Sequence, residues 1–301
     1  MIKNLEKDIF CEVSTKESVA SLLPKRQRDS HKGTYGRAAI VAGSERYTGA
    51  AYLSTAACLR AGAGYTALFT PKGILPHYML KAPEALLTPL CEGGEMRFEE
   101  SVFEDLLAYD SIVYGMGMGI SEAVACGAVY LLEHYTGKLI LDADGLNSLA
   151  AYQKESFSKI FTEKKCNVLL TPHVKEFSRL SGKTVEEIRA EGVRAPLAFA
   201  KKYQVGVLLK SSTSILTDGE RICLNETGNS GQAKGGSGDV LSGVIAGLCA
   251  SGASVFDGGK IAAYLVGRAA ELAAQELSEY ALTASDLIAY LGKAFLDVLH
   301  S

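Results

Sequence analysis

The residues best suited to chemistry lie at 228–239, a segment with five glycines that ends in Asp239 and runs directly into an apolar stretch with helical spacing. Glycines allow main-chain amides to turn toward one point, and a helix N-terminus adds the positive end of its dipole. We therefore predict an anion hole at Gly236, Ser237 and Gly238. Asp239 would lie in the first helical turn, either as a base beside a bound phosphate or as the cap of a simple Gly-rich turn.

A lysine followed by hydroxyl side chains forms a second candidate group. Lys210 ends the apolar segment 205–210. An ammonium group and neighbouring hydroxyls suit the oxygens of a polyphosphate. The alternative interpretation is a solvated lysine at the end of a strand. The hydroxyl residues are Ser211, Ser212, Thr213 and Ser214.

Carboxylates and an imidazole follow two further apolar segments. Asp142 and Asp144 come after 138–141, and His173 comes after 167–170. The two carboxylates are candidate magnesium ligands, directly or through water, and Asp144 is equally suited to cap the next helix. His173 is either a hydrogen-bond partner for a substrate or simply a surface residue.

Segments typical of strands alternate with segments typical of helices, which predicts a doubly wound α/β fold with a mostly parallel sheet and helices on both faces. Ligands of such folds bind at the carboxyl ends of the strands, so the residues above are expected to meet at one edge of the sheet. A β-hairpin is predicted in the C-terminal third, at 215–217 and 222–224. The other predicted strands are 37–42, 65–69, 111–114, 138–141, 167–170 and 205–210.

The predicted domain organisation and the predicted helices are simple. Residues 1–30 are expected to form an N-terminal helix and arm, and residues 31–301 a single α/β domain. The helix predicted at 185–203 contains Pro196, which is expected to kink it. The remaining helices are predicted at 14–23, 49–61, 121–134, 239–249, 255–277 and 284–299.

Three known motifs occur only in part. The end of a Walker A loop is present at 181–184, but Phe177 replaces its first Gly and the segment ends a helix, so we predict a helix terminus and a loop. In the loop 115–119, which includes Gly117, a ligand site is expected, but Ile120 replaces the last Gly of a dinucleotide fingerprint. The segment Gly-Gly-Ser-Gly at 235–238 resembles the start of a nucleophile elbow. Asp239 stands where that motif needs its last Gly, which argues against a serine hydrolase.

Composition excludes several classes of protein. The 301 residues are 48% hydrophobic and 22% charged, as in ordinary globular proteins. A formal net charge of -3 lacks the excess of basic residues that is typical of proteins that bind nucleic acid or anionic membranes. No run approaches the roughly 18 apolar residues of a membrane span, and no signal peptide is expected. Seven scattered cysteines without a Cys-x-x-Cys pair argue for a reducing, cytoplasmic location.

Several segments, in order along the chain, together carry a family resemblance. The sequence resembles the ADP- or ATP-dependent NAD(P)H-hydrate dehydratases of the ribokinase-like superfamily, in the stand-alone form typical of bacteria. These enzymes restore NADHX and NADPHX, the hydrated forms of the reduced cofactors. The matching segments are His31-Lys32-Gly33, Gly36-Arg37, Gly43-Ser44, Tyr47-Thr48-Gly49-Ala50, Leu59-Arg60-Ala61-Gly62-Ala63-Gly64, Leu141-Asp142-Ala143-Asp144, Leu170-Thr171-Pro172-His173 and 228–248.

The resemblance implies a phosphorylation of the hydrate hydroxyl followed by elimination of phosphate. Asp239 is implied as the general base, with Ala50, Gly117 and His173 as further contacts to the hydrate. It also implies Mg²⁺ with ADP or ATP as phosphoryl donor, a homotetramer, and a separate NAD(P)HX epimerase as functional partner. The implied nucleotide site consists of Lys210, Ser211, Ser212, Thr213, Ser214 and Gly238.

The chain departs from the usual family pattern at a few positions, none of which removes an implied catalytic group. Ser211 replaces a Gly after the lysine, Met116 and Ser230 replace prolines, and 174–175 is Val-Lys instead of Pro-Gly. Two alternatives remain open at this stage. One is a vitamin or sugar-alcohol kinase of the same superfamily, and the other is a nucleotide sensor without turnover.

Overall fold

The central strands are apolar on both faces, which is the pattern of a sheet covered by helices on both sides. The structure, a computed structural model, describes residues 10–153 and 156–300. Within them, one ten-stranded sheet has the order β1-β10-β9-β8-β7-β6-β5-β2-β3-β4. The strands are β1 (Phe10–Val13), β2 (Arg37–Val41), β3 (Tyr65–Thr70), β4 (Leu86–Pro89), β5 (Ser111–Tyr114), β6 (Lys138–Leu141), β7 (Asn167–Leu170), β8 (Gly206–Leu209), β9 (Ser214–Thr217) and β10 (Arg221–Asn225).

Pairing in the sheet is parallel except around one strand. β9 is antiparallel to both β8 and β10, so the predicted β-hairpin is confirmed. β1 pairs in parallel with β10, with Phe10 opposite Arg221. This edge strand lies in the segment predicted as helix and arm, and its half-exposed side chains gave no strand signal. The doubly wound, mostly parallel α/β prediction is confirmed.

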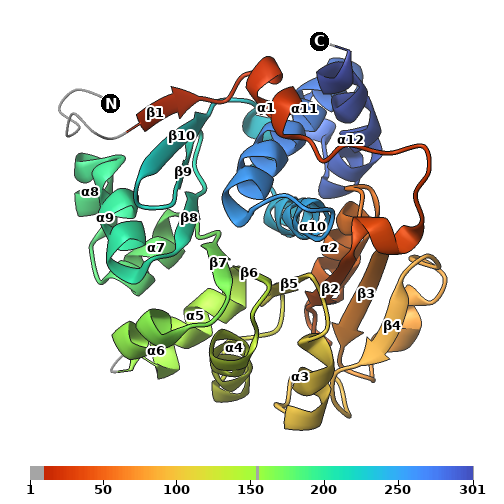
Figure 1. Cartoon of the computed structure of the whole chain (residues 1–301), viewed down its shortest axis with the longest axis vertical. Helices are drawn as coiled ribbons and strands as arrows, with labels where there is room; N and C mark the ends of the chain where they lie inside the picture. Colours follow the sequence, from red (N-terminus) through yellow and green to blue (C-terminus); the bar gives the residue numbers. More distant parts are fainter. Residues whose placement is uncertain (1–9, 154–155, 301) are drawn as a thin grey trace.

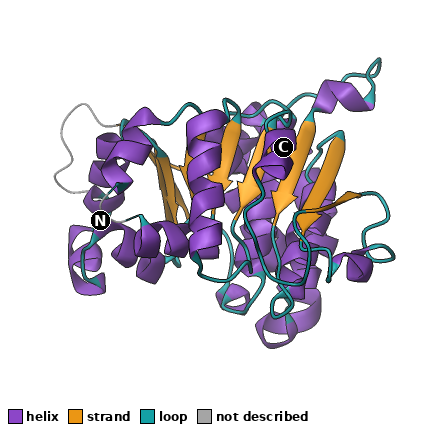
Figure 2. Cartoon of the chain, turned by 90° about the horizontal axis from the view of Figure 1, so that it is seen from below, coloured by secondary structure: helices purple, strands orange, loops and turns teal. Residues whose placement is uncertain are grey.

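Helices cover both faces of the sheet (Figures 1 and 2). One face carries α1 (Lys16–Leu22), α2 (Thr48–Leu59), α10 (Ser237–Ala250), α11 (Val255–Ala281) and α12 (Ala284–Leu299). The opposite face carries α3 (Glu100–Leu106), α4 (Glu122–His134), α5 (Ala143–Tyr152), α6 (Phe157–Glu163), α7 (Val174–Ser181), α8 (Val185–Glu191) and α9 (Arg194–Tyr203). Short 3₁₀ helices are η1 (Lys32–Tyr35), η2 (Leu75–Tyr78) and η3 (Ser230–Gln232).

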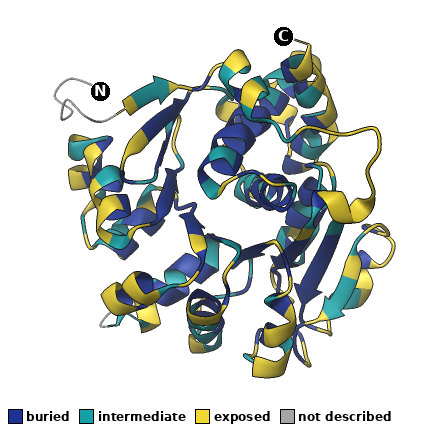
Figure 3. Ribbon diagram, in the orientation of Figure 1, coloured by how far each residue is buried: buried dark blue, intermediate teal, exposed yellow. Residues whose placement is uncertain are grey.

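Successive strand residues feed two separate cores, as the alternation of side chains along a strand requires. Ile40 and Val113 pack under α10, whereas their neighbours Val41 and Ile112 pack on the opposite face. All four side chains are fully buried. Figure 3 shows this burial along the central strands and along α10. Because burying each such side chain contributes roughly 1.5–3 kcal/mol, the two cores hold the sheet rigidly under the loops.

The register of the central strands brings the candidate residues together. Tyr114, Leu141 and Leu170 end β5, β6 and β7 side by side. The residues that follow each strand therefore lie along one edge, which we call the carboxyl edge. An isolated parallel bridge between His173 and Lys210 extends this alignment to β8.

The helix predicted at 185–203 is wrong in one respect, because it is two helices. α8 ends at Glu191, because the next residue, Gly192, has a φ of 57°, and α9 begins at Arg194. Pro196 does not kink the chain. It lies in the first turn of α9, where a main-chain amide has no helical partner to lose.

Candidate active site

The glycine-rich segment ends in the first turn of α10. Gly236 is the residue before the helix and has a left-handed backbone with φ 97°, and Ser237, Gly238 and Asp239 are its first three helical residues. Amides in a first helical turn have no partner within the helix and remain available to an anion. The helix behind them is buried from Ser242 onward, so this turn is held firmly.

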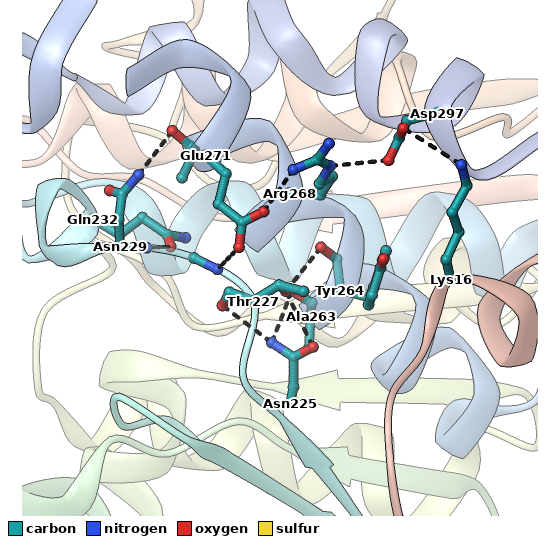
Figure 4. Close-up of polar contacts among 12 residues, drawn as sticks. Lys16, Asn225, Thr227, Asn229, Gln232, Ala263, Tyr264, Arg268, Glu271 and Asp297 are labelled. Atoms are coloured by element: carbon teal, nitrogen blue, oxygen red, sulfur yellow. Dashed lines mark hydrogen bonds and ion pairs between the residues drawn. The ribbon is translucent and has the colours of Figure 1, made fainter. Parts of the chain in front are cut away.

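The chain between β10 and α10 is hydrogen-bonded to α11 at the start of this segment (Figure 4). The Thr227 hydroxyl lies 3.1 Å from the carbonyl oxygen of Tyr264, and the Gly228 amide donates to Glu271 Oε1 at 2.8 Å. The Asn229 amide group donates to the Ala270 carbonyl at 2.9 Å. These bonds set where the glycine-rich segment begins.

The carboxylate of Glu271 is itself held in place. Arg268 Nη1 donates to Glu271 Oε2 at 2.9 Å, and Arg268 Nε donates to Asp297 Oδ2 at 2.9 Å. Lys16 on α1 lies 3.5 Å from the same aspartate (Figure 4). The N-terminal helix, α11 and α12 thus contribute to one polar chain that ends at the glycine-rich segment.

Lys210 and Asp142 form an ion pair at the centre of the carboxyl edge. Lys210 Nζ lies 2.8 Å from Asp142 Oδ1, and Ser242 donates to Asp142 Oδ2 at 2.7 Å. The same ammonium lies 3.4 Å from the position that a Cβ on Gly238 would occupy. The lysine therefore points at the first turn of α10, as the predicted phosphate site requires.

The charges around Asp239 favour its protonated form. Burial, the largest cause, together with the nearby Asp142 and Asp144 carboxylates raises the pKa of Asp239 to about 7, although the charge of Lys210 opposes this shift. Burial alone would lower the pKa of Lys210, but Asp142 and Glu176 raise it overall, so the lysine stays charged. A carboxyl that titrates near neutrality beside a fixed cation is suited to proton transfer.

Asp144 lies beside the ion pair, in a strained stretch of backbone. Ala143 has φ 48°, which is left-handed and unfavourable for a residue with a Cβ. Asp142 caps α5, and Asp144 Oδ2 accepts a hydrogen bond from the Gly119 amide at 2.8 Å. Burial raises the pKa of Asp144 despite that bond. Asp144 thus joins the β5 loop to the β6 loop.

His173 begins α7 and caps it with its own side chain. Its Nδ1 accepts hydrogen bonds from the amides of Lys175 at 3.1 Å and Glu176 at 3.2 Å. Burial, and then the charge of Lys210, lower the pKa of His173. The imidazole is therefore neutral and carries its proton on Nε2, and the side chain as a whole is half exposed.

The predicted substrate contacts Ala50 and Gly117 lie against each other. A Cβ on Gly117, whose φ is 63°, would lie 2.8 Å from the Cβ of Ala50 and 2.8 Å from that of Tyr47. Only glycine fits this approach of the β5 loop to α2. The two small residues lie next to Tyr47, whose side chain is exposed.

The hydroxyl residues after Lys210 form a tight turn between β8 and β9. Ser211 Oγ donates to the Thr213 carbonyl at 2.5 Å, and Ser214 Oγ donates to the Ser211 carbonyl at 3.2 Å. Ser212 is exposed. Ser211 has no positive φ, so its replacement of a family glycine introduces no backbone strain.

The expected magnesium ligands fit poorly as a direct metal site. Both oxygens of Asp142 are engaged, one by Lys210 and the Ala143 amide and the other by Ser242. In the described part of the chain, no group of three or more His, Cys, Asp or Glu side chains could hold a metal ion. A lysine ammonium at 2.8 Å also occupies the position where a cation would bind.

Two residues of the site were missed by the sequence reasoning. Glu176 is 6% exposed, accepts the His173 amide at 2.8 Å, and places Oε1 3.4 Å from His173 Nε2. Its position three residues after a cap, as in a capping box, is the signal that could have found it. Ser242 lies three residues after Asp239, on the same face of α10.

Fold and site together define a class: α/β enzymes that handle phosphate groups at the carboxyl edge of a mostly parallel sheet. The sequence model of one such family, the NAD(P)H-hydrate dehydratases, matches residues 38–293. The chain belongs to this family. Among the described residues, no helix has the length and apolar character needed to cross a bilayer.

Two relatives of this chain differ in length. The ADP-dependent (S)-NAD(P)H-hydrate dehydratase of Cenarchaeum symbiosum is 34% identical over 90% of this chain and 92% of its own. The bifunctional NAD(P)H-hydrate repair enzyme of Thermofilum pendens is 38% identical over 96% of this chain. The chain spans only 55% of that relative, about half the length of such bifunctional proteins.

A solved structure supports the same assignment. The ADP/ATP-dependent NAD(P)H-hydrate dehydratase of Bacillus subtilis, co-crystallised with ATP and Mg²⁺, superimposes with a TM-score of 0.83 at 30% identity. The match covers 97% of this chain and 100% of the other. The whole doubly wound architecture is therefore shared.

Proposed function

We propose that this chain converts NADHX and NADPHX back to NADH and NADPH in a reaction driven by ADP or ATP. The main observation behind this proposal is the position of Asp239, a partly buried carboxyl with a pKa of about 7 in the first turn of α10. It lies beside the charged Lys210 and among free helix amides. Family membership supplies the substrate class.

The first step is phosphorylation of the hydrate hydroxyl. Asp239 accepts the hydroxyl proton while the hydroxyl oxygen attacks the terminal phosphorus of ADP or ATP. The bond between that phosphorus and the bridging oxygen breaks, and AMP or ADP is the leaving group. Main-chain amides at Gly236, Ser237 and Gly238 stabilise negative charge on the transferring group, together with the Lys210 ammonium. Hydroxide, a poor leaving group, has then become a phosphate ester.

Elimination completes the reaction. The ring nitrogen of the reduced pyridine donates its electron pair, the carbon–oxygen bond breaks, and inorganic phosphate departs with both bonding electrons. Loss of a ring proton then restores the dihydropyridine. Neutral His173, with its proton on Nε2, can donate a hydrogen bond to the hydrate. Ala50 and Gly117 are small, which leaves space beside them for the ring.

The nucleotide is proposed to lie over the turn after β8. That turn presents Lys210, the hydroxyl residues 211–214, and Gly238 across from them. Mg²⁺ is proposed to arrive with the nucleotide, held by phosphate oxygens, because the protein side chains offer no three-ligand cluster in the described residues. Assays with and without a chelator test this requirement.

Direct assay decides the proposal. Purified chain is incubated with NADHX or NADPHX, Mg²⁺, and either ADP or ATP. Recovery of the absorbance of reduced nicotinamide together with one phosphate per turnover is expected. Asp239→Ala should fold normally and lose roughly 100-fold or more of the activity. Turnover by that variant at the wild-type rate would refute the role of Asp239.

The alternatives give different products. A vitamin or sugar-alcohol kinase would accumulate a stable phosphorylated product and release no free phosphate. A nucleotide sensor would bind without turnover and keep its function in Asp239→Ala. Family membership favours the dehydratase over both.

We also propose a cytoplasmic homotetramer that works with a separate epimerase. The family resemblance is the basis of this part of the proposal, and the chain spans about half the length of the bifunctional relatives that it matches. Light scattering tests the assembly. Adding a purified epimerase to a racemic hydrate preparation should raise the yield of reduced cofactor from about half to nearly all.

A further inference from the structure

Asp142 is a buried carboxylate that serves as the counter-ion of Lys210. Its carboxyl is 1% exposed and makes three hydrogen bonds. Oδ1 accepts from Lys210 Nζ at 2.8 Å and from the Ala143 amide at 2.9 Å, and Oδ2 accepts from Ser242 at 2.7 Å. Each oxygen is therefore occupied by a hydrogen donor, and one of these donors is the Lys210 ammonium, which stands where a metal cation would bind.

These bonds join three separate elements at the carboxyl edge. Asp142 follows β6, Lys210 follows β8, and Ser242 belongs to the second turn of α10. The position that a Cβ on Gly238 would occupy lies 3.9 Å from Asp142 Oδ2 and 3.4 Å from the lysine. The carboxylate thus fixes both the cation and the amides that are to contact one phosphoryl group.

We propose that Asp142 is a positioning residue, which holds Lys210 and the first turns of α10 in the arrangement needed for phosphoryl transfer, and that it is not a magnesium ligand. This inference rests on the proposed function above. For Asp142, it replaces the expectation from residue type alone that Asp142 and Asp144 bind magnesium, directly or through water.

The two roles predict opposite effects on binding. A buried negative charge beside Lys210 weakens the attraction of the site for phosphate, so its removal should leave nucleotide affinity unchanged or higher. The lysine then lacks the partner that orients it, which slows the chemical step. A metal ligand, in contrast, would be needed to bind the magnesium–nucleotide complex, so its removal would weaken that binding.

Steady-state kinetics of Asp142→Asn separate these roles. We expect kcat to fall at least tenfold, the KM for ADP to stay equal or decrease, and the Mg²⁺ concentration for half-maximal rate to stay within about twofold of wild type. An increase of tenfold or more in that Mg²⁺ concentration would overturn the proposal. Asp286→Asn, the same change in an exposed capping box of α12, is the matched control and should leave all three values unchanged.

Ser242→Ala provides a second variant that keeps the charge. Removing the hydroxyl frees Oδ2 of Asp142 and loosens α10, so kcat should fall threefold or more with no change in the Mg²⁺ requirement. If Asp142 ligates magnesium, the freed oxygen would instead lower the Mg²⁺ concentration needed. This outcome would also contradict the proposal, even if Asp142→Asn fails to fold.

Calorimetry with ADP keeps the test independent of turnover. If the wild-type chain does not process NAD(P)H hydrates, the proposed function fails, but ADP titrations with and without Mg²⁺ still report on Asp142. The proposal expects Asp142→Asn to bind ADP at least as tightly as wild type and to gain the same factor from Mg²⁺. Loss of that gain in the variant would show that Asp142 holds the metal.

Discussion

His173 Nδ1 accepts hydrogen bonds from two main-chain amides, and the nearer of the two, that of Lys175, lies 3.1 Å away. One ring nitrogen therefore serves the fold, as the cap of α7. The other, Nε2, keeps the proton and lies 3.4 Å from Glu176 Oε1 on a side chain that is half exposed. A single side chain thus couples the start of a helix to the substrate side of the site.

Replacing His173 with Asn and with Ala should separate these two tasks. Asn can still cap α7, so we expect unfolding free energies within about 0.5 kcal/mol of wild type, whereas Ala should lose about 1 kcal/mol. Both variants lack Nε2 and should raise the KM for the hydrate several-fold. Urea unfolding and steady-state kinetics measure the two effects, and equal stability of the two variants would contradict the capping role.

The pH dependence of the reaction should report Asp239. The pKa of Asp239 is raised to about 7, chiefly by burial, and only the ionised form accepts a proton. We expect kcat/KM for the hydrate to fall about tenfold per pH unit below this value and to level off above it. Lys210, with its raised pKa, should cause no loss in the neutral range. A profile that stays flat down to pH 5 would contradict the assignment.

The same carboxyl should make wild-type stability depend on pH. Its folded pKa lies above its unfolded value, so its contribution to stability is present below the unfolded pKa and is lost as pH rises through about 7. Asp239→Asn cannot ionise and should exceed wild type in unfolding free energy by about 4 kcal/mol at pH 8, given about 1.4 kcal/mol per pKa unit and a shift from 3.8 to about 7. At pH 5, about one unit above the unfolded pKa, the difference should be smaller by roughly 2–3 kcal/mol, and it should vanish only below about pH 4. Denaturant titrations at both pH values measure it, and an equal difference at each would refute the burial of an ionising group.

Gly267 allows the segment after β10 to approach α11. A Cβ there would lie 2.3 Å from the Thr227 hydroxyl oxygen. Gly267→Ala should therefore destabilise the chain by about 1–3 kcal/mol. It should also weaken ADP binding several-fold, because the glycine-rich segment starts at this contact. Thermal unfolding and calorimetry would record the two losses.

A second helical glycine provides the matched control for that substitution. Gly292 on α12 has no atom within 4 Å of its Cβ position. Gly292→Ala should stabilise the chain by roughly 0.5–1 kcal/mol through helix propensity and leave ADP affinity unchanged. If both variants behaved alike, the contact between Thr227 and α11 would have no special role.

Local sequence patterns predicted the central strands well. β5, β6 and β7 begin and end where the apolar runs do, because a fully buried strand needs continuous apolar residues between polar turns. The edge strands β1 and β4 were missed, since each is short and half exposed. β1 also depends on a partner far along the chain, β10, which no local pattern reveals.

The sequence by itself determined the start of α10, because glycines before an apolar helical run set both the turn and the place of Asp239 within a few residues. Tertiary structure decided what surrounds that carboxyl. Asp142, Lys210 and Ser242 meet only because β6, β7 and β8 are neighbours and the N-terminal turns of α10 lie at the carboxyl edge. Strand order and burial are long-range properties, and they alone raise the pKa of Asp239 and fill both oxygens of Asp142 with hydrogen donors.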